Sequence, residues 1–326
     1  MDDGICVIVA AMNAEDTVAR AVASALAERE VAEVVVIDDA SRDATAAAAR
    51  SADDGSGRLK VHRSRLNLGP AAARNLALAR SSAPLVAVLD ADDAILPGRF
   101  AALADPQGDW DMSADNIIFV APEQAAGIAG LSAFATGGTA ERMSFARFVA
   151  ANISQPDRPR GELGFLKPVM RRAFLQRHGL AYDPAMRLGE DFDLYARMLL
   201  AGARFRLVAA CGYVALERPD SLSAKHAAAD LAALVAADER MLAGPMREED
   251  RSILLAHRAQ SAQRWHHRHF LDAKQRRGLV RALIEHRDRP RLLLDAGLGV
   301  ARDKLALLRG SPSAPRAASH RFLIAP

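Results

Sequence analysis

Residues 86–93 read Val86-Ala87-Val88-Leu89-Asp90-Ala91-Asp92-Asp93, so a short apolar run ends directly in three carboxylates. Four apolar residues in a row predict a strand that is buried on both faces of a sheet. Crowded carboxylates repel one another, and a bound divalent cation with oxygen ligands, Mg²⁺ or Mn²⁺, relieves that repulsion. An acidic turn is the alternative, because aspartate favours turns. The stretch therefore predicts either a metal site or a plain turn after a buried strand.

The chain before this stretch alternates strands with helices. Apolar runs at 5–10, 34–37 and 59–62 predict strands, and the patterns at 14–28, 45–51 and 71–79 predict helices. Such alternation indicates an α/β fold with a mostly parallel sheet flanked by helices. Ligands of these sheets bind beyond the carboxyl ends of the strands, where Asp38 and Asp39 also fall. We expect a binding site at this edge.

The composition is that of a globular protein, since half of the 326 residues are hydrophobic and a quarter are charged. Cys6 and Cys211 lie far apart in the sequence and indicate neither a disulfide framework nor a cysteine-based metal site. The first residues carry no basic flank, and the apolar run 5–12 is too short to span a bilayer. We therefore expect no export signal or transmembrane helix, and a cytoplasmic location.

The basic charge is concentrated toward the C-terminus. Residues 247–326 hold 17 Lys and Arg against 8 Asp and Glu, whereas the preceding residues hold 26 against 32. From residue 227 the apolar residues recur at helical spacing, and we expect helices and no strand. The histidines beside Trp265 lack accompanying cysteines or spaced carboxylates, so they indicate a basic face rather than a metal site. We interpret this region as a surface for an anionic membrane.

Four motifs follow one another within the first 100 residues. They are Asn13-Ala14-Glu15, Val36-Ile37-Asp38-Asp39-Ala40-Ser41-Arg42-Asp43-Ala44-Thr45, Asn67-Leu68-Gly69 with Arg74-Asn75, and Asp90-Ala91-Asp92-Asp93. In order and spacing they resemble the nucleotide-binding half of family 2 glycosyltransferases, which have the Rossmann-like GT-A fold of nucleotide-diphospho-sugar transferases. One departure is Ala10, which stands where the family often has a proline and which affects the stiffness of the following loop.

The resemblance implies a donor site for a UDP-sugar. Its nucleotide-side residues are Ala10, Asn13, Glu15, Asp39, Arg74 and Asp90. Asp39 is expected to accept a hydrogen bond from the uracil ring, and Asp92 to ligate Mg²⁺ or Mn²⁺ at the diphosphate. Whether Asp93 or His226 joins the metal is left open. Lys225 and His226 are further candidates for the diphosphate, and a solvated loop is the alternative.

Residues 188–194 read Leu188-Gly189-Glu190-Asp191-Phe192-Asp193-Leu194 and resemble the E-D motif of the same family. Within this motif Asp191 stands at the position of the family's general base. A carboxylate suits that role, because an inverting sugar transfer needs a group that takes the proton from the attacking hydroxyl. A carboxylate at a helix start can also be a favourable first-turn charge. The segment 161–172 is similar to the part of the family that faces donor and acceptor.

Between these motifs the patterns are weaker. Residues 109–120 and 205–208 predict strands, 145–153 predict a helix, and 127–141 predict a loop. We divide the chain into a GT-A domain at 1–226, with a nucleotide-binding half at 1–100 and an acceptor half at 101–226, and a basic helical region at 227–326.

The resemblance implies an inverting glycosyltransferase of bacterial exopolysaccharide assembly, of the succinoglycan type. It would move a hexose, with glucose the favoured sugar, from a UDP-sugar to a lipid-linked oligosaccharide, in the cytoplasm or on the cytoplasmic face of the inner membrane. A sugar-nucleotide nucleotidyltransferase is one alternative, but its glycine-rich loop is missing after the first strand. A non-catalytic basic-tailed binding protein is another, although no nucleic-acid recognition motif is present and no nucleic acid is expected.

Overall fold

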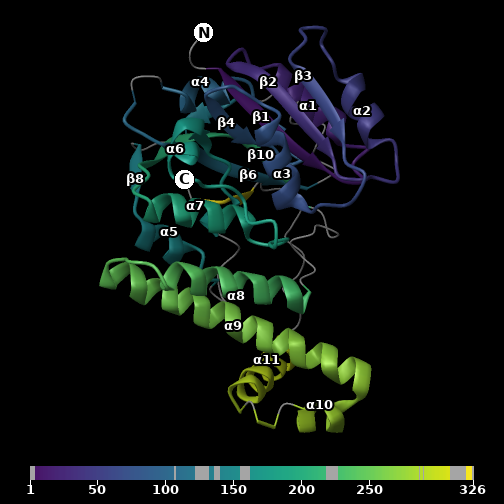
Figure 1. Cartoon of the computed structure of the whole chain (residues 1–326), viewed down its shortest axis with the longest axis vertical. Helices are drawn as coiled ribbons and strands as arrows, with labels where there is room; N and C mark the ends of the chain where they lie inside the picture. Colours follow the sequence, from purple (N-terminus) through teal and green to yellow (C-terminus); the bar gives the residue numbers. More distant parts are fainter. Residues whose placement is uncertain are drawn as a thin grey trace. The chain divides into compact units, whose positions relative to one another are not determined.

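The computed structural model describes residues 4–105, 108–121, 132–135, 140–154, 162–217, 227–285, 287–288, 290–308 and 321–324. The described chain divides into two compact units (Figure 1). The first unit contains residues 4–217 together with 321–324, and the second contains residues 227–308. We describe each unit by itself.

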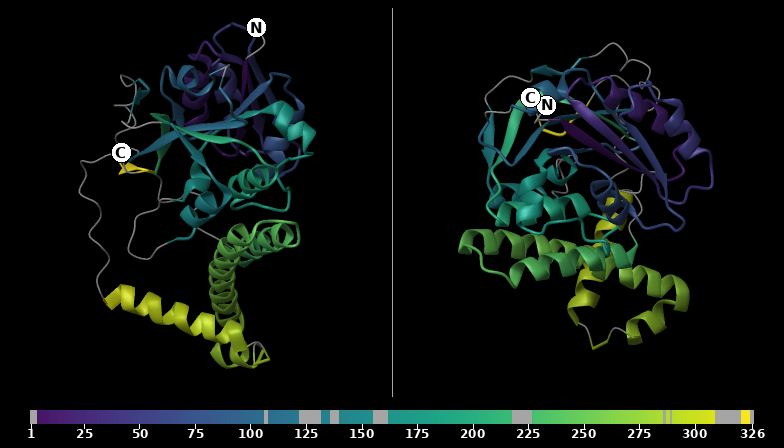
Figure 2. Two further views of the ribbon diagram at one scale, coloured as in Figure 1. Left: turned by 90° about the vertical axis from the view of Figure 1, so that its left-hand side faces the viewer. Right: turned by 45° about the horizontal axis from the view of Figure 1, so that its top comes forward.

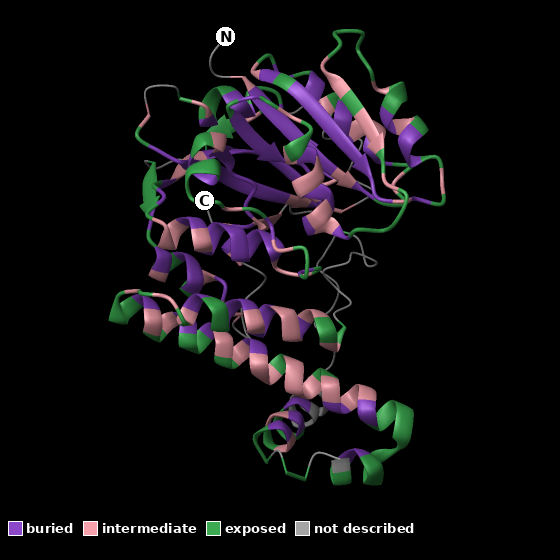
Figure 3. Ribbon diagram, viewed as in Figure 1, coloured by how far each residue is buried: buried purple, intermediate pink, exposed green. Residues whose placement is uncertain are grey.

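The first unit begins with parallel strands joined by helices. The strands are β1 (Ile5–Ala11), β2 (Val31–Asp38), β3 (Leu59–Arg63) and β4 (Leu85–Val88), and the helices are α1 (Val18–Leu26), α2 (Thr45–Ser51) and α3 (Pro70–Ala79). β1 pairs in parallel with β2 and with β4, and β2 pairs in parallel with β3. Figure 3 shows β1, β2 and β4 as buried, as continuous apolar strands require. The predicted α/β alternation is confirmed.

The second half of the sheet is mixed. Its strands are β5 (Ala94–Ile95), β6 (Met112–Val120), β7 (Phe134–Ala135), β8 (Glu141–Met143), β9 (Val169–Arg171) and β10 (Phe205–Leu216). The sheet runs β3-β2-β1-β4-β9-β6-β10-β5, and β9 lies antiparallel between β4 and β6. The helical elements here are α4 (Arg99–Leu103), α5 (Phe145–Ala151), the 3₁₀ turn η2 (Leu163–Phe165), α6 (Arg172–Arg177) and α7 (Glu190–Leu200).

Two local predictions for this half are wrong. The segment 127–141 was expected to be a loop, but its described part contains β7 and the first residue of β8, which both pair with β10. The strand expected at 205–208 continues to Leu216, because its second half lies between β6 and the short β5. Partner strands, and not the local pattern, decide both outcomes.

A short strand near the C-terminus also returns to the first unit. β11 (Arg321–Phe322) pairs antiparallel with β6, so the expectation of no strand beyond residue 227 is wrong. The side chain of Asn116 holds this segment, since its Nδ2 donates to the Ile324 carbonyl at 2.7 Å and its Oδ1 accepts from the Ile324 N–H at 3.0 Å. Two residues of strand leave no periodic pattern in the sequence, which is why the strand was missed.

The second unit is helical, as predicted. Its helices are α8 (Ala228–Leu242), α9 (Glu248–Arg277), α10 (Leu279–Glu285) and α11 (Pro290–Leu308). α8 and α9 lie side by side (Figure 2), and His257 Nδ1 of α9 lies 2.9 Å from Asp238 Oδ2 of α8. Among the helices of the described residues, none is both long and apolar enough to cross a membrane.

Candidate active site

The acidic stretches that follow β2 and β4 lie at one edge of the sheet. β1 is paired with β2 up to Ala11 and Asp38, and β4 runs parallel to β1, so the carboxyl ends of these strands meet. Asp38 is fully buried and its Oδ1 accepts the Ser41 N–H at 2.9 Å. The edge on which ligands of parallel sheets bind is therefore the edge that carries the carboxylates.

Asp39 fixes the loop in front of α3. It is buried, its Oδ1 accepts the Leu68 N–H at 2.7 Å, and its Oδ2 accepts the Gly69 N–H at 2.8 Å. Gly69 has a φ of +84°, which favours glycine, and α3 begins at the next residue. The Asp39 and Asn67-Leu68-Gly69 motifs are thus two parts of one hydrogen-bonded structure.

The loop after β1 is joined to the loop after β2 in the same way. The Asn13 N–H donates to Ser41 Oγ at 2.9 Å, and Asn13 Oδ1 accepts the Arg42 N–H at 2.9 Å. Glu15 Oε2 accepts the Ala44 N–H at 2.8 Å. Ala10 is half-buried at the end of β1. The structure brings these three predicted nucleotide-side positions together, and Asn13 and Glu15 hold the two loops against each other.

Buried ion pairs connect the acidic loop after β4 with the start of α7. Arg74 of α3 donates through Nη2 to Asp90 Oδ1 at 2.7 Å, and through Nη1 to Glu190 Oε1 at 2.6 Å and Asp191 Oδ1 at 3.0 Å. Lys167 Nζ lies 2.9 Å from Asp90 Oδ2 and 2.7 Å from Asp191 Oδ2. Asp90 and Asp191 are therefore held by the same two cations. We call these five residues the ion cluster.

The charges of the ion cluster stabilise one another. Burial lowers the pKa of both Arg74 and Lys167. The negative charges of Asp191 and Asp90 outweigh the effect of burial on both residues, and Glu190 adds to this for Arg74. Both pKa values are therefore raised above their usual range. Burial raises the pKa of Asp90, but the positive charges of Lys167 and Arg74 lower it by more than burial raises it. The pKa of Asp90 is therefore depressed below its usual value. Burial raises the pKa of Glu190 despite Arg74. Arg74, Lys167 and Asp90 are therefore charged at neutral pH.

Asp93 contacts β10. Its Oδ2 accepts the Tyr213 hydroxyl proton at 2.7 Å and its Oδ1 accepts the Leu216 N–H at 3.0 Å. Burial, together with the nearby Asp90 and Asp92, raises the pKa of Asp93 well above its usual range. A carboxyl group in this environment holds the acidic loop against β10.

Asp92 of the acidic loop is half-buried, as Asp90 is, and its backbone carbonyl accepts a hydrogen bond from Arg20 Nη2 at 2.8 Å. Among the described residues, no group of three or more histidine, cysteine, aspartate or glutamate side chains is arranged to hold a metal. Mg²⁺ is commonly held by one or two carboxylates and by substrate phosphates, so a complete protein cage is not required. Asp92, with Asp90 beside it, fits a divalent cation that arrives with a diphosphate.

Sequence reasoning missed part of this site. The segment 161–172 was expected to face donor and acceptor, but Lys167 was not singled out, because a lysine before a proline carries no catalytic signal of its own. The side-chain amide of Asn75 pairs with the backbone of Tyr182, since Asn75 Nδ2 donates to the Tyr182 carbonyl at 2.8 Å and Asn75 Oδ1 accepts the Tyr182 N–H at 3.0 Å. The Tyr182 ring lies 5.5 Å from the Arg74 guanidinium carbon. Asn75 of the Arg74-Asn75 motif therefore holds the Tyr182 ring beside the guanidinium group of Arg74 in the ion cluster. The candidate ligands Lys225 and His226 lie outside the described residues.

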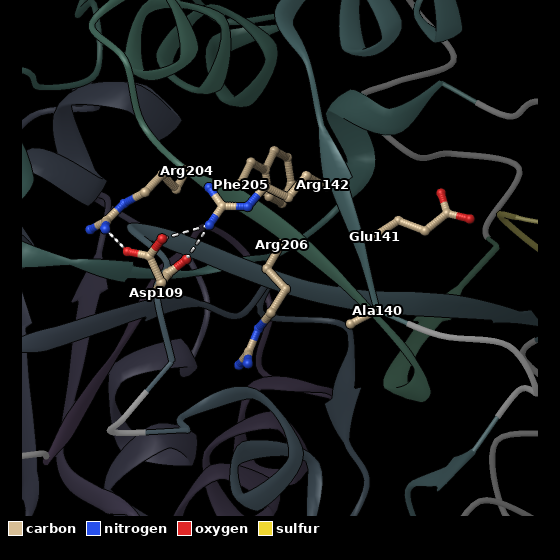
Figure 4. A pocket seen from close by; sticks show the side chains of 7 residues that line it. All are labelled: Asp109, Ala140, Glu141, Arg142, Arg204, Phe205 and Arg206. Carbon is tan, nitrogen blue, oxygen red and sulfur yellow. Dashed lines mark hydrogen bonds and ion pairs between the residues drawn. The ribbon is translucent and has the colours of Figure 1, made fainter.

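A separate surface hollow lies near the amino ends of β6 and β10 (Figure 4). It is lined by Asp109, Ala140, Glu141, Arg142, Arg204, Phe205 and Arg206. Asp109 forms ion pairs with Arg142 at 2.6 Å and with Arg204. Since β6 runs in the same direction as β4, this hollow lies at the opposite edge of the sheet from the ion cluster.

The fold and the site together are those of a GT-A glycosyltransferase, with an acidic loop after β4 and a carboxylate at the start of α7. Residues 6–123 match the model of Glycosyl transferase family 2. The chain is 49% identical over 313 residues to the succinoglycan biosynthesis protein ExoU of Rhizobium meliloti (strain 1021), covering 95% of this chain and 91% of that protein. The chain belongs to glycosyl transferase family 2 and is a glycosyltransferase.

Solved structures share the fold. S. aureus TarS 1–349 in complex with UDP-GlcNAc has a TM-score of 0.57 and 20% identity, covering 86% of this chain and 79% of that one. The mannosyltransferase PcManGT from Pyrobaculum calidifontis, in complex with GDP-Man and Mn²⁺, has a TM-score of 0.52 and 18% identity, covering 93% and 80%. The predicted GT-A fold is confirmed, and family membership sets aside the nucleotidyltransferase and binding-protein alternatives.

Proposed function

We propose that the chain transfers a hexose, with inversion, from a UDP-sugar to a hydroxyl of a lipid-linked oligosaccharide in succinoglycan-type exopolysaccharide assembly. Glucose is the favoured sugar. The observation that carries the proposal is the shared pairing of Asp90 and Asp191 with Arg74 and Lys167, which brings a carboxylate base beside the acidic loop. The name of the ExoU relative supports the pathway, and the UDP-GlcNAc bound to TarS supports the donor class.

The donor would lie across the carboxyl ends of β1, β2 and β4. The loops that carry Ala10, Asn13 and Glu15 would border the nucleotide. Asp39 already accepts two backbone hydrogen bonds, and a carboxylate has further lone pairs with which to accept one from the uracil ring. A divalent cation, Mg²⁺ or Mn²⁺, held by Asp92 with Asp90 beside it, would offset the charge on the departing diphosphate.

Asp191 would take the proton from the acceptor hydroxyl. Each of its oxygens accepts one hydrogen bond from a cation, so the carboxylate is oriented and retains lone pairs for the acceptor. Its position at the start of α7, after Gly189 with a φ of +71°, sets the direction of the side chain. A single displacement with one base inverts the anomeric carbon.

Calorimetry of UDP binding tests the donor site. With Mn²⁺ the wild type should bind UDP, and a chelator or Asp92→Ala should remove that binding. Asp53→Ala, on an exposed loop after α2, is the matched control and should bind as the wild type does. Binding that withstands both the chelator and Asp92→Ala would contradict the metal site. Tighter binding of GDP than of UDP would contradict the UDP-sugar donor.

The acceptor is tested separately by incubating the chain with UDP-hexoses and lipid-linked oligosaccharides. We expect extension by one sugar with inverted configuration, read by mass spectrometry and by nuclear magnetic resonance of the new linkage. A retained configuration would refute the single displacement. Because the acceptor is proposed to be lipid-linked, we also propose that the chain works at the cytoplasmic face of the inner membrane.

A further inference from the structure

The short helix α10 exposes its large apolar side chains. Leu279, Val280, Leu283 and Ile284 are 49%, 70%, 43% and 56% exposed, whereas Ala282 between them is fully buried. An amphipathic helix of a globular protein directs its large apolar residues to the core. α10 does the reverse, since it contacts the rest of the unit through an alanine and leaves four aliphatic side chains outside.

The neighbouring helix α11 has a similar outward row. Leu294 and Leu298 are one turn apart, and they are 65% and 48% exposed. The inward side of α11 contributes Leu292 and Ala296 to a small core that also contains Ala282 of α10 and Phe270 and Ala273 of α9. Both helices are therefore anchored on α9 and still present large aliphatic residues to the surroundings.

Cations flank these aliphatic residues in the sequence. Residues 274–291 contain seven Lys and Arg against two Asp and Glu. The described cations among them are all exposed, and they are Lys274, Arg276, Arg277, Arg281, Arg287 and Arg291. An anionic bilayer offers both acyl chains for the aliphatic residues and phosphate headgroups for the cations.

We propose that α10 and the first half of α11, which we call the aliphatic surface, bind an anionic phospholipid bilayer. The aliphatic side chains enter the headgroup and acyl boundary while the surrounding cations contact lipid phosphates. A second copy of the chain fits this surface less well, because its own excess of arginine would face the same excess on the first copy. The sequence predicted a membrane surface on the basic helical region 227–326 as a whole. Within that region Trp265 is half-buried and His266 Nδ1 lies 2.7 Å from Asp295 Oδ2 of α11, so the exposed aliphatic residues of α10 and α11 fit the bilayer better.

Co-sedimentation of the full chain with vesicles tests this proposal. Wild type should pellet with vesicles of phosphatidylglycerol and phosphatidylcholine, and much less with phosphatidylcholine alone. Val280→Ser combined with Ile284→Ser should weaken partition by about tenfold or more, since two aliphatic side chains lose their transfer free energy. Arg281→Gln combined with Arg291→Gln should weaken partition to the anionic vesicles and reduce its salt dependence.

Leu255→Ser is the matched control, because Leu255 of α9 is 48% exposed but lies outside the aliphatic surface. It should pellet as the wild type does. Unchanged thermal unfolding of all variants by circular dichroism confirms that exposed substitutions leave the fold intact. Equal partition to both kinds of vesicle, or full partition of the Val280/Ile284 variant, would overturn the proposal. A dimer in gel filtration that the same variant dissociates would assign the surface to self-association instead.

This test needs no catalysis, and its failure differs from a failure of the proposed function. The aliphatic surface lies in the second unit, so the variants should bind UDP as the wild type does. Lost vesicle binding with retained UDP binding supports the aliphatic surface alone. Retained vesicle binding in a chain that binds no nucleotide would leave the aliphatic surface standing and remove the donor site.

Discussion

Replacing Lys167 with methionine removes one of the two cations that hold the ion cluster together. Lys167 is 5% exposed and pairs with Asp90 at 2.9 Å and with Asp191 at 2.7 Å. Removing one partner of a buried ion pair costs about 3–5 kcal/mol, because the remaining charge is left uncompensated. Arg74 still contacts both carboxylates, and the Asp90 side chain is 34% exposed. We therefore expect Lys167→Met to lower the free energy of unfolding by about 2–3 kcal/mol.

The cost should depend on pH in a predictable direction. The folded state depresses the pKa of Asp90 below its ordinary 3.8, so the stability it contributes is present above that pH and is lost as the pH falls further. The folded state raises the pKa of Lys167 above its ordinary 10.5, so its contribution is present below that pH and is lost on raising it. The cost of Lys167→Met is therefore full at neutral pH and smaller below about pH 3.8.

Urea unfolding followed by tryptophan fluorescence measures this cost. The chain has two tryptophans, Trp110 in the first unit and Trp265 in the second. In a Trp265→Phe background the buried Trp110 reports on the unit that contains the ion cluster. Separate reporters are needed because the two units can unfold independently.

Lys60→Met is the matched control for this measurement. Lys60 pairs with Glu33, but its side chain is 43% exposed. Burial raises the pKa of Glu33, yet Lys60 and the N–H groups of Ser82 and Ala83 bring it down to about 2. Since those N–H groups remain in the variant, we expect a cost below about 1 kcal/mol. The description of the ion cluster would be refuted if Lys167→Met and Lys60→Met lowered the free energy of unfolding equally, and if the loss caused by Lys167→Met did not become smaller at acid pH.

Three further predictions concern the proposed base, the cysteines and the C-terminal strand of the first unit. Asp191→Asn should lower kcat by about 10²–10⁴-fold and leave UDP binding unchanged, and a variant with wild-type turnover would rule Asp191 out as the base. Burial raises the pKa of Cys6 to about 11 and that of Cys211 to about 12, so iodoacetamide at about pH 8 should label the folded chain slowly and the urea-unfolded chain rapidly. Asn116→Ala should lower the free energy of unfolding by about 1–3 kcal/mol in the Trp110 assay, because it frees the C-terminal segment, and unchanged stability would show that this segment is held in another way.

The first half of the fold could be predicted because its signals are local. A buried parallel strand is a continuous apolar run, and residues 34–37 lie within the observed β2. The alanine-rich stretch 45–51 coincides with α2, since alanine has the highest helix propensity. α1 begins only at Val18, because residues 14–17 form the loop that joins the one after β2.

The ion cluster could be predicted only in part, because its pairs are distant in the sequence. Arg74, Asp90 and Asp191 belong to motifs, and each was identified before its partners were known. Lys167 carries no motif, and only the antiparallel β9 that follows it brings it against the end of β4. Neither its burial nor its two ion pairs leave a trace in the residues beside it.

The charges of the ion cluster bear on the proposed metal. Arg74 and Lys167 are both paired with Asp90 and Asp191. If either cation turned toward the diphosphate of a UDP-sugar, it would leave a carboxylate of the cluster without its partner, at a cost of several kcal/mol. A divalent cation at Asp92 adds positive charge at the diphosphate without breaking these pairs. A chelator should therefore abolish UDP binding even though two cationic side chains lie beside the proposed donor site.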